Sequence, residues 1–306
     1  MKKFLIGLVV ALGIFNTAIV IKDNKPEVSQ FNVHQHDDIS KLPMPIALDH
    51  PLAKMGTNLA PIEIRDESVR KYISAGVRIA NDHGEFGSGT IVYYDSKDNI
   101  AWIQSCGHLF NGNMSGEEGK KRNMTCKITT WYHNNEKLAK PQDYTANVHY
   151  YSNGTGRDIS LLSFKPDWKP DYFPIAPSTF VLPDNTSLIS IGCDGAREIA
   201  AYNVKSVGLR GGELVTNNNS PRPGRSGGGL LTTNDLYIGI CVRTSDVSGN
   251  GIGLFTPLQT VISYNKNNGY GWLNEVGTNW ARQLPIVDRN NKQNMYDKDY
   301  IPLPNR

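Results

Sequence analysis

Short apolar runs rich in valine, isoleucine, threonine and tyrosine constrain the fold of this chain more than any other feature of its sequence. A first group lies between residues 75 and 164, and a second lies between residues 187 and 258. The proline-rich segment KPDWKPDYFP at 165–174 separates them. Neither group contains a long stretch with the 3.6-residue period of a helix. Many short strands at short spacing are typical of all-β sandwiches and barrels, so we expect an all-β fold with two sets of strands.

The two ends of the chain differ from this pattern. Two lysines precede an apolar run over residues 4–21, so residues 1–21 have the composition of a signal peptide or an N-terminal membrane anchor. Either one places the rest of the chain outside the cytoplasm, as a secreted, periplasmic or anchored protein. Residues 22–67 are polar with scattered prolines and indicate a linker or pro-segment, and residues 271–306 form a polar C-terminal tail.

The composition excludes several classes of function. The chain of 306 residues is 39% hydrophobic and 20% charged, so it can form a core, and its net charge of +3 is too small to indicate nucleic-acid binding. The densest basic run, at 120–122, follows two glutamates and is typical of a solvated loop. His34, His36 and Asp37 have a spacing near that of metal ligands, but they lie in the polar N-terminal region. We therefore expect neither a metal nor another cofactor.

Four cysteines, at positions 106, 126, 193 and 241, allow three disulfide pairings. Export would permit disulfides, and the cysteines fall two and two in the two groups of runs. We therefore expect the pairs Cys106–Cys126 and Cys193–Cys241, with four free, buried thiols as the alternative.

The glycine-rich segment PRPGRSGGGLLT at 221–232 surrounds the hydroxyl of Ser226. It is either a turn between strands or the backbone around a catalytic nucleophile. A nucleophilic serine needs a base, a third group that orients this base, and backbone N–H groups that receive the oxyanion. The histidines that could serve as the base all precede Ser226, at positions 34, 36, 50, 83, 108, 133 and 149. The α/β-hydrolase fold, whose nucleophile elbow GRSGG also fits, is excluded because it places its histidine after the serine.

The subtilisin order places an aspartate before the histidine on a parallel α/β sheet, and the strand-only pattern argues against such a sheet. The order that remains is histidine, aspartate, serine. His108 ends the run IAWIQSCGH, Asp158 begins the run DISLLSF 50 residues later, and Ser226 follows after a further 68 residues. Asp171 and Asp194 are the alternative aspartates, but neither begins an apolar run of this kind. His108, Asp158 and Ser226 are therefore the candidate catalytic residues.

Several segments in this order resemble the chymotrypsin-like (trypsin-fold) serine peptidases. GSGTIVYYDSKDNIAWIQSCGHLF at 87–110 is similar to that family's strand, turn, strand and histidine segment. DISLLSF is similar to its aspartate segment, PGRSGGGLL to its Gly-x-Ser-Gly-Gly segment, and IGICV with GIGLFTPL to the strands that line its specificity pocket. The resemblance runs from about residue 68 to 265. It implies two six-stranded antiparallel β-barrels, over 68–170 and 171–270, with the active site in the cleft between them.

The resemblance also implies roles for the candidate residues. His108 is the expected general base, Asp158 orients it and Ser226 attacks, while the N–H groups of Gly224 and Ser226 form the oxyanion hole. The expected function is that of an exported serine endopeptidase that acts on protein or peptide substrates. A catalytically silent homologue that acts as a binding module, and a strand-rich structural protein whose glycine segment is only a turn, are the alternatives.

One residue departs from the pattern of the animal digestive members of this family. Arg225 stands where they have an aspartate that pairs with a newly formed N-terminus, so we expect activity without such processing. In this respect the chain looks closer to bacterial and viral branches, including the HtrA-like group, although it has no room for the PDZ domain of that group.

The base of the expected specificity pocket carries no aspartate. The absence of this charge argues against a preference for Arg or Lys in the substrate. The expected pocket residues are Ser220 at the base, and Val242, Arg243, Thr244 and Gly253 along the walls. They favour small or medium uncharged side chains, while Arg243 leaves a preference for acidic residues open.

Overall fold

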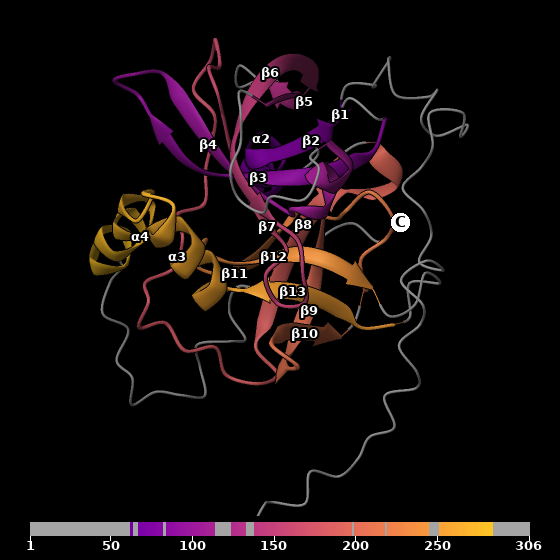
Figure 1. The fold of residues 1–306 in the computed structure, drawn as a ribbon, viewed down its shortest axis with the longest axis vertical. Coiled ribbons are helices and arrows are strands. Elements are labelled where there is room, and N and C mark those ends of the chain that lie inside the picture. The colour runs from indigo at the N-terminus through magenta and orange to yellow at the C-terminus, as the bar shows by residue number, and fades with distance from the viewer. Residues whose placement is uncertain are drawn as a thin grey trace, which may run out of the picture. The chain divides into compact units, whose positions relative to one another are not determined.

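Strand pairing in the computed structural model divides the strands into two closed barrels (Figure 1). The structure describes residues 62–63, 67–81, 84–113, 124–132, 138–197, 199–217, 219–244 and 251–283. The expected export signal, nearly all of the expected linker, the basic run at 120–122, the end of the tail and the histidines at 34, 36, 50, 83 and 133 lie outside the described residues. Within the described part of the chain, no helix is long and apolar enough to cross a membrane.

The first barrel contains the strands of the first group of apolar runs. Its strands pair antiparallel in the order β6-β5-β2-β3-β4-β7, and a further pairing of β6 with β7 closes the ring. β1 pairs with the start of β6 outside this ring. The strands are β1 (Ile62–Glu63), β2 (Gly76–Ala80), β3 (Phe86–Asp95), β4 (Ile100–Ser105), β5 (Thr125–Tyr132), β6 (Leu138–Ser152) and β7 (Ile159–Phe164). Branched aliphatic side chains suit a closed sheet, and those of Val77, Ile79, Ile91, Ile103 and Ile128 are fully buried.

The second barrel is closed in the order β10-β13-β12-β11-β8-β9. Its strands are β8 (Ser187–Cys193), β9 (Ile199–Arg210), β10 (Glu213–Asn217), β11 (Gly229–Thr232), β12 (Tyr237–Thr244) and β13 (Gly253–Pro257). The expected architecture of two six-stranded antiparallel barrels is therefore confirmed. The apolar runs of the sequence do not reveal β10, because Leu214 and Val215 are its only apolar residues.

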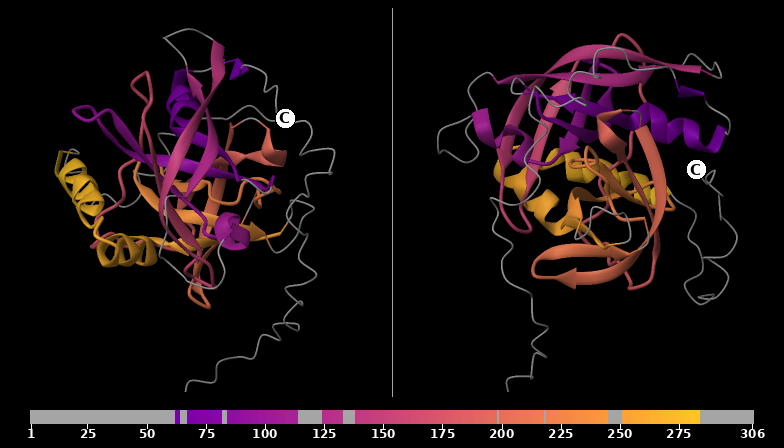
Figure 2. Two further views of the ribbon diagram at one scale, coloured as in Figure 1. Left: turned by 45° about the horizontal axis from the view of Figure 1, so that its top comes forward. Right: turned by 90° about the vertical axis from the view of Figure 1, so that its right-hand side faces the viewer.

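Helices occupy the ends of the described chain and two turns between strands. α2 (Glu67–Ala75) precedes the first barrel, and α3 (Leu258–Asn267) and α4 (Trp272–Gln283) follow the second. The 3₁₀ helices are η3 (His108–Asn113) and η4 (Asp194–Ala196). α3 matches the short helix that LQTVISYN suggests, whereas α2 lies where the sequence indicates no helix, because nine residues are too few for a clear period. Figure 2 shows α3 and α4 packed on the outside of the barrels.

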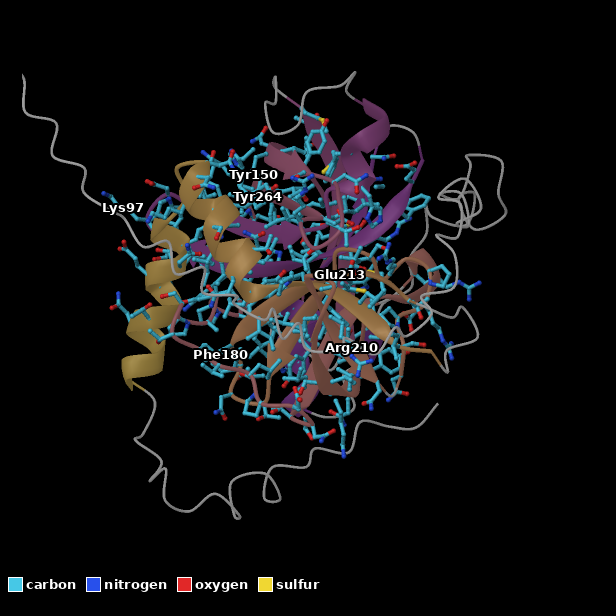
Figure 3. The ribbon with its side chains drawn as sticks, turned by 60° about the horizontal axis from the view of Figure 1, so that its bottom comes forward. Lys97, Tyr150, Phe180, Arg210, Glu213 and Tyr264 are labelled. Atoms are coloured by element: carbon cyan, nitrogen blue, oxygen red, sulfur yellow. The ribbon has the colours of Figure 1, made fainter. Side chains whose placement is uncertain are left out.

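α3 joins the second barrel to the first through one buried amide. The side-chain oxygen of Asn265 accepts hydrogen bonds from Gln104 Nε2 of β4 at 2.9 Å and from the Tyr150 hydroxyl of β6 at 2.6 Å. Tyr264 of α3 lies close to Tyr150 of β6 (Figure 3), with ring centroids 6.4 Å apart. Because a buried amide needs its partners, these bonds fix α3 against the first barrel.

The expected disulfides are absent, because all four cysteines are free and buried. Cys106 directly follows β4, and three strand steps separate β4 from β5, which carries Cys126, in either direction around the six-stranded ring. Cys193 on β8 and Cys241 on β12 are separated by β11. Adjacent strands lie about 4.8 Å apart, so each pair is farther apart than the roughly 7 Å that a disulfide can span.

Candidate active site

The pairing of β4 with β7 brings His108 and Asp158 together. These strands run antiparallel with Ser105 opposite Ser160, so the residues that follow β4 meet the residues that precede β7. Gly107 makes the close approach possible, because a Cβ atom there would overlap the backbone of Ser152.

The contacts between His108 and Asp158 orient the imidazole ring. His108 Nδ1 lies 2.5 Å from Asp158 Oδ2, and the other carboxylate oxygen accepts the N–H groups of Gly107 at 2.6 Å and His108 at 2.9 Å. The Thr256 hydroxyl donates to the backbone carbonyl of Asp158 at 2.8 Å. A carboxylate can only accept hydrogen bonds, so Nδ1 carries the proton, and Nε2 of the neutral ring is available as a base.

The surroundings of His108 favour its charged form. Burial disfavours the charge and is the largest single influence, but the Cys106 sulfur and the Asp158 carboxylate outweigh it and raise the pKa of His108 well above its usual value of 6.5. Nε2 lies 3.6 Å from Cys106 Sγ. Burial raises the pKa of the Cys106 thiol, and the neighbouring His108 opposes this shift.

The loop between β10 and β11 carries Ser226 and depends on its glycines. Gly224 and Gly227 have φ angles of 91° and 88°, in the region that L-residues with a side chain rarely adopt. A Cβ atom on Gly227 would lie 3.0 Å from the backbone nitrogen of Cys106, so the loop lies directly against the segment that ends in His108.

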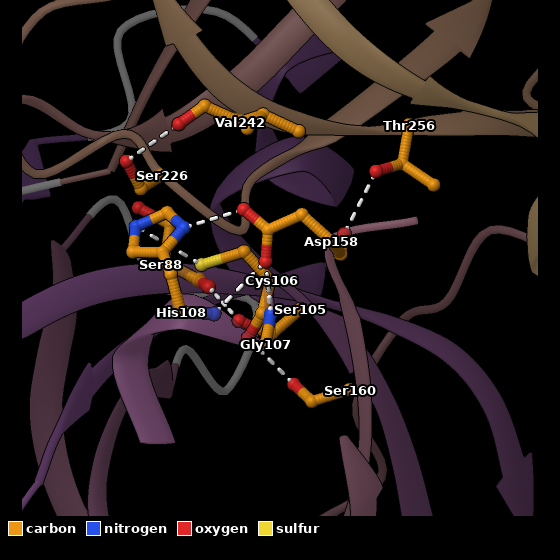
Figure 4. A network of polar contacts seen from close by, with 10 residues as sticks. All are labelled: Ser88, Ser105, Cys106, Gly107, His108, Asp158, Ser160, Ser226, Val242 and Thr256. Atoms are coloured by element: carbon orange, nitrogen blue, oxygen red, sulfur yellow. Dashed lines mark hydrogen bonds and ion pairs between the residues drawn. The ribbon is translucent and has the colours of Figure 1, made fainter. Parts of the chain in front are cut away.

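The hydroxyl of Ser226 does not donate to His108 in this structure. It donates instead to the carbonyl oxygen of Val242 at 3.1 Å, while the imidazole lies between Ser226 and Asp158 (Figure 4). Hydrogen bonds of a catalytic site often form only in the complex with substrate. His108 is therefore oriented and lies next to the Ser226 hydroxyl, but no hydrogen bond joins the two in this structure.

Ser88 of β3 fixes the loop to the first barrel. Its N–H donates to the Ser226 carbonyl and its hydroxyl donates to the Gly224 carbonyl, both at 2.7 Å. The N–H of Cys193 in turn donates to the Ser88 hydroxyl at 2.7 Å. The N–H groups of Gly224 and Ser226 donate to no protein acceptor among the described residues, so both are available for an oxyanion.

The sequence of residues 87–240, which spans β3 to β12, matches the family model described as trypsin-like peptidase domain. The chain belongs to this family. No curated protein matches the sequence of this trypsin-like peptidase.

Three solved structures to which this chain is similar are as follows. Rv3671c from M. tuberculosis H37Rv, in the inactive form of a serine-to-alanine mutant, has a TM-score of 0.45 and 13% identity, covering 67% of this chain and 92% of that one. The MamO protease domain from Magnetospirillum magneticum has a TM-score of 0.45 and 14% identity, and the match covers 64% of this chain and 97% of that domain. The serine endoprotease from Yersinia pestis has a TM-score of 0.46 and 18% identity, and the match covers 69% of this chain and 66% of that protein.

The expected pocket residues of this trypsin-like peptidase lie around the ends of β10, β12 and β13. Ser220 is buried, and its hydroxyl has no partner among the described residues. Arg243 donates to Glu213 of β10 at 2.9 Å, and Thr244 donates to the Ile252 carbonyl at 3.3 Å. Gly253, opposite Thr216 on β10, completes the set.

Glu213 is a residue of this region that the sequence does not reveal. It is 5% exposed, and one of its carboxylate oxygens has no partner among the described residues. The pairing of Arg243 with Glu213 offsets the positive charge of Arg243, which weakens a preference for acidic substrates. The signal in the sequence is a lone acidic residue at the start of a short apolar stretch.

Cys106, His108 and Asp158 together have donor atoms of the types that bind metals, all within 4.8 Å of one another. Two of the three residues already bind each other, because His108 Nδ1 donates to Asp158. The cluster therefore fits an acid–base pair with an adjacent thiol, and the arrangement supports proton transfer.

Proposed function

We propose that this protein is a serine endopeptidase that uses Ser226 as nucleophile and His108 as general base. The observation that carries the proposal is the His108–Asp158 pair, in which two backbone N–H groups hold the carboxylate and the carboxylate holds the imidazole. This pair lies against a glycine-rich loop with one serine hydroxyl and two N–H groups that donate to no acceptor among the described residues. Acyl transfer needs these parts and no cofactor.

The mechanism begins with a rotation of the Ser226 side chain. Its hydroxyl leaves the Val242 carbonyl and donates to His108 Nε2, which takes the proton as the oxygen attacks the substrate carbonyl. The N–H groups of Gly224 and Ser226 receive the negative charge of the tetrahedral intermediate. His108 then gives the proton to the leaving amine, and water releases the acyl group by the same steps.

We further propose that the enzyme acts on proteins or peptides outside the cytoplasm. The apolar run over residues 4–21 supports export. Whether this segment is removed or remains as a membrane anchor can be read from the mass of the protein recovered from a membrane fraction.

A catalytically silent homologue that binds peptides is the second candidate. One observation favours it: the Ser226 hydroxyl is bonded to Val242, and Cys106 Sγ lies at hydrogen-bonding distance from His108 Nε2. In a silent homologue these contacts would persist when a peptide binds.

Labelling of the full chain with a fluorophosphonate probe separates the two candidates. An endopeptidase reacts at Ser226, and the variants Ser226→Ala and His108→Ala do not. A folded parent that is not labelled, while it retains affinity for peptides, would contradict the enzymatic proposal and support the binding module.

A further inference from the structure

The residue before the proposed nucleophile is a buried arginine with an acidic partner. The Arg225 side chain is 1% exposed, and its guanidinium donates twice to Asp194, from Nε to Oδ1 at 2.9 Å and from Nη2 to Oδ2 at 2.6 Å. Asp194 opens η4, the turn that follows β8, and its side chain is 17% exposed. This is the two-pronged geometry in which an arginine fixes both distance and direction.

A tyrosine also contacts both members of this ion pair. The guanidinium carbon of Arg225 lies 4.0 Å from the centre of the Tyr202 ring, and the Tyr202 hydroxyl donates to Asp194 Oδ2 at 2.7 Å. The aromatic face stabilises the cation, and the hydroxyl stabilises the carboxylate. Gly192 of β8 leaves space for the arginine, because a Cβ atom there would lie 2.6 Å from Arg225 Cγ.

The residue after Asp194 contacts the same loop through the backbone. The Gly195 N–H donates to the Pro223 carbonyl at 2.7 Å. Because a trans peptide unit is planar and its N–H and C=O point in opposite directions, a carbonyl held toward η4 turns the N–H of Gly224 the other way. Gly224 is the first of the two proposed oxyanion donors.

The second donor is fixed in the same manner. The Arg225 carbonyl accepts the N–H of Gly228 at 2.8 Å. This carbonyl belongs to the same peptide unit as the Ser226 N–H, which therefore points to the opposite side. Arg225 thus lies between the two peptide units that supply the proposed oxyanion hole, and its side chain determines where its own backbone sits.

A buried ion pair adds little net stability, because desolvation of both charges offsets their attraction, and in some proteins such a pair instead selects one conformation. We infer that Arg225, Asp194 and Gly195 form an internal clamp that positions the N–H groups of Gly224 and Ser226 for the oxyanion. Arg225 and Asp194 are positioning residues in this inference, which rests on the proposed function. Since both charges belong to the folded chain, the clamp forms without a newly generated N-terminus.

The test compares the full-length parent with Arg225→Met, which keeps the unbranched stem of the side chain and removes the charged fork, and with Arg225→Lys, which keeps the charge and removes the fork. Lys127→Met is the control, because it breaks the exposed Lys127–Asp143 pair of the first barrel. Each protein is labelled with a fluorophosphonate, and both the rate and the final extent of labelling are recorded. Hydrogen exchange is measured at the amides of Gly195 and Gly228, whose acceptors lie in the loop.

The clamp predicts that Arg225→Met is labelled about 100-fold more slowly, the effect of losing one oxyanion donor, yet reaches the same final extent. The labelling rate of Arg225→Lys lies between the rates of the parent and Arg225→Met, and the rate of Lys127→Met equals that of the parent. A merely structural role would lower the final extent and leave the rate of the folded molecules unaltered. The amides of Gly195 and Gly228 should exchange faster in Arg225→Met than in the parent.

The outcomes also separate this inference from the proposed function. Equal labelling rates and equal exchange in the parent and Arg225→Met would overturn the clamp and leave the endopeptidase proposal intact. A parent that is never labelled, combined with faster exchange in Arg225→Met, would refute the endopeptidase proposal and support the clamp as the element that orders the loop. Unchanged exchange overturns the clamp in either case.

Discussion

Replacement of Asp158 by asparagine tests the orientation of the imidazole. In the parent, one carboxylate oxygen accepts two backbone N–H groups and the other accepts His108 Nδ1. An asparagine has one oxygen and one NH₂ group. The oxygen must face the N–H groups of Gly107 and His108, because an NH₂ group there would leave two buried donors without an acceptor, at a cost of about 1–3 kcal/mol each. The NH₂ group is therefore directed at Nδ1.

This arrangement reverses the protonation of the ring. Nδ1 becomes an acceptor, so the proton of the neutral imidazole moves to Nε2, and Nε2 no longer accepts the Ser226 proton. The loss of the carboxylate also removes the charge that stabilises the imidazolium of His108. An aspartate-to-asparagine change in such a triad lowers the rate about 10⁴-fold, or roughly 5.5 kcal/mol in activation free energy.

The assay is the second-order rate of fluorophosphonate labelling, with circular dichroism to establish that the variant is folded. Asp143→Asn serves as the matched control, because Asp143 is half exposed and pairs with Lys127 on the barrel surface. The control should label like the parent. A folded Asp158→Asn protein whose rate lies within tenfold of the parent would refute the assignment of Asp158.

Three other predictions follow from the geometry of the site. A general base acts in its neutral form, and the pKa of His108 is raised, so kcat/KM should rise with pH to a plateau with its midpoint above pH 6.5. A midpoint at or below pH 6.5 would contradict the stabilisation of charged His108 by Cys106 and Asp158. Cys106→Ala removes the contact with Nε2 and one cause of the raised pKa, so labelling should become about two- to fivefold faster and the midpoint should fall. Gly227→Ala introduces a Cβ atom into the Ser88 carbonyl at a positive φ, so it should cost about 4 kcal/mol or more in unfolding free energy. Gly211→Ala is the control, because Gly211 also has a positive φ but an added Cβ atom there would have no neighbour within 4 Å. In chemical denaturation it should lower the free energy of unfolding by only about 1 kcal/mol.

The order of the chemistry-bearing residues predicts a large part of the fold and the site. His108 and Asp158 each adjoin an apolar run, and the antiparallel pairing of β4 with β7 brings the end of one run next to the start of the other. The resemblance adds the number of strands. Strand β10 escapes prediction because a strand of five residues with two apolar side chains gives no periodic signal.

Contacts between distant turns are not visible in the sequence. Asp194 enters there only as an alternative catalytic aspartate, and its pairing with Arg225 depends on how η4 packs against the loop, 31 residues away in the chain. The disulfide prediction fails for a related reason. The distribution of Cys106 and Cys126 within one barrel says nothing of their positions around its circumference.

The three hydrogen bonds of Ser88 have a mechanical consequence. This residue belongs to the barrel that carries the base, yet it holds the backbone on both sides of Arg225 in the other barrel. A displacement of one barrel against the other at this point would break these hydrogen bonds. They therefore hold the loop of the proposed nucleophile, Ser226, at a fixed distance from the barrel that carries His108.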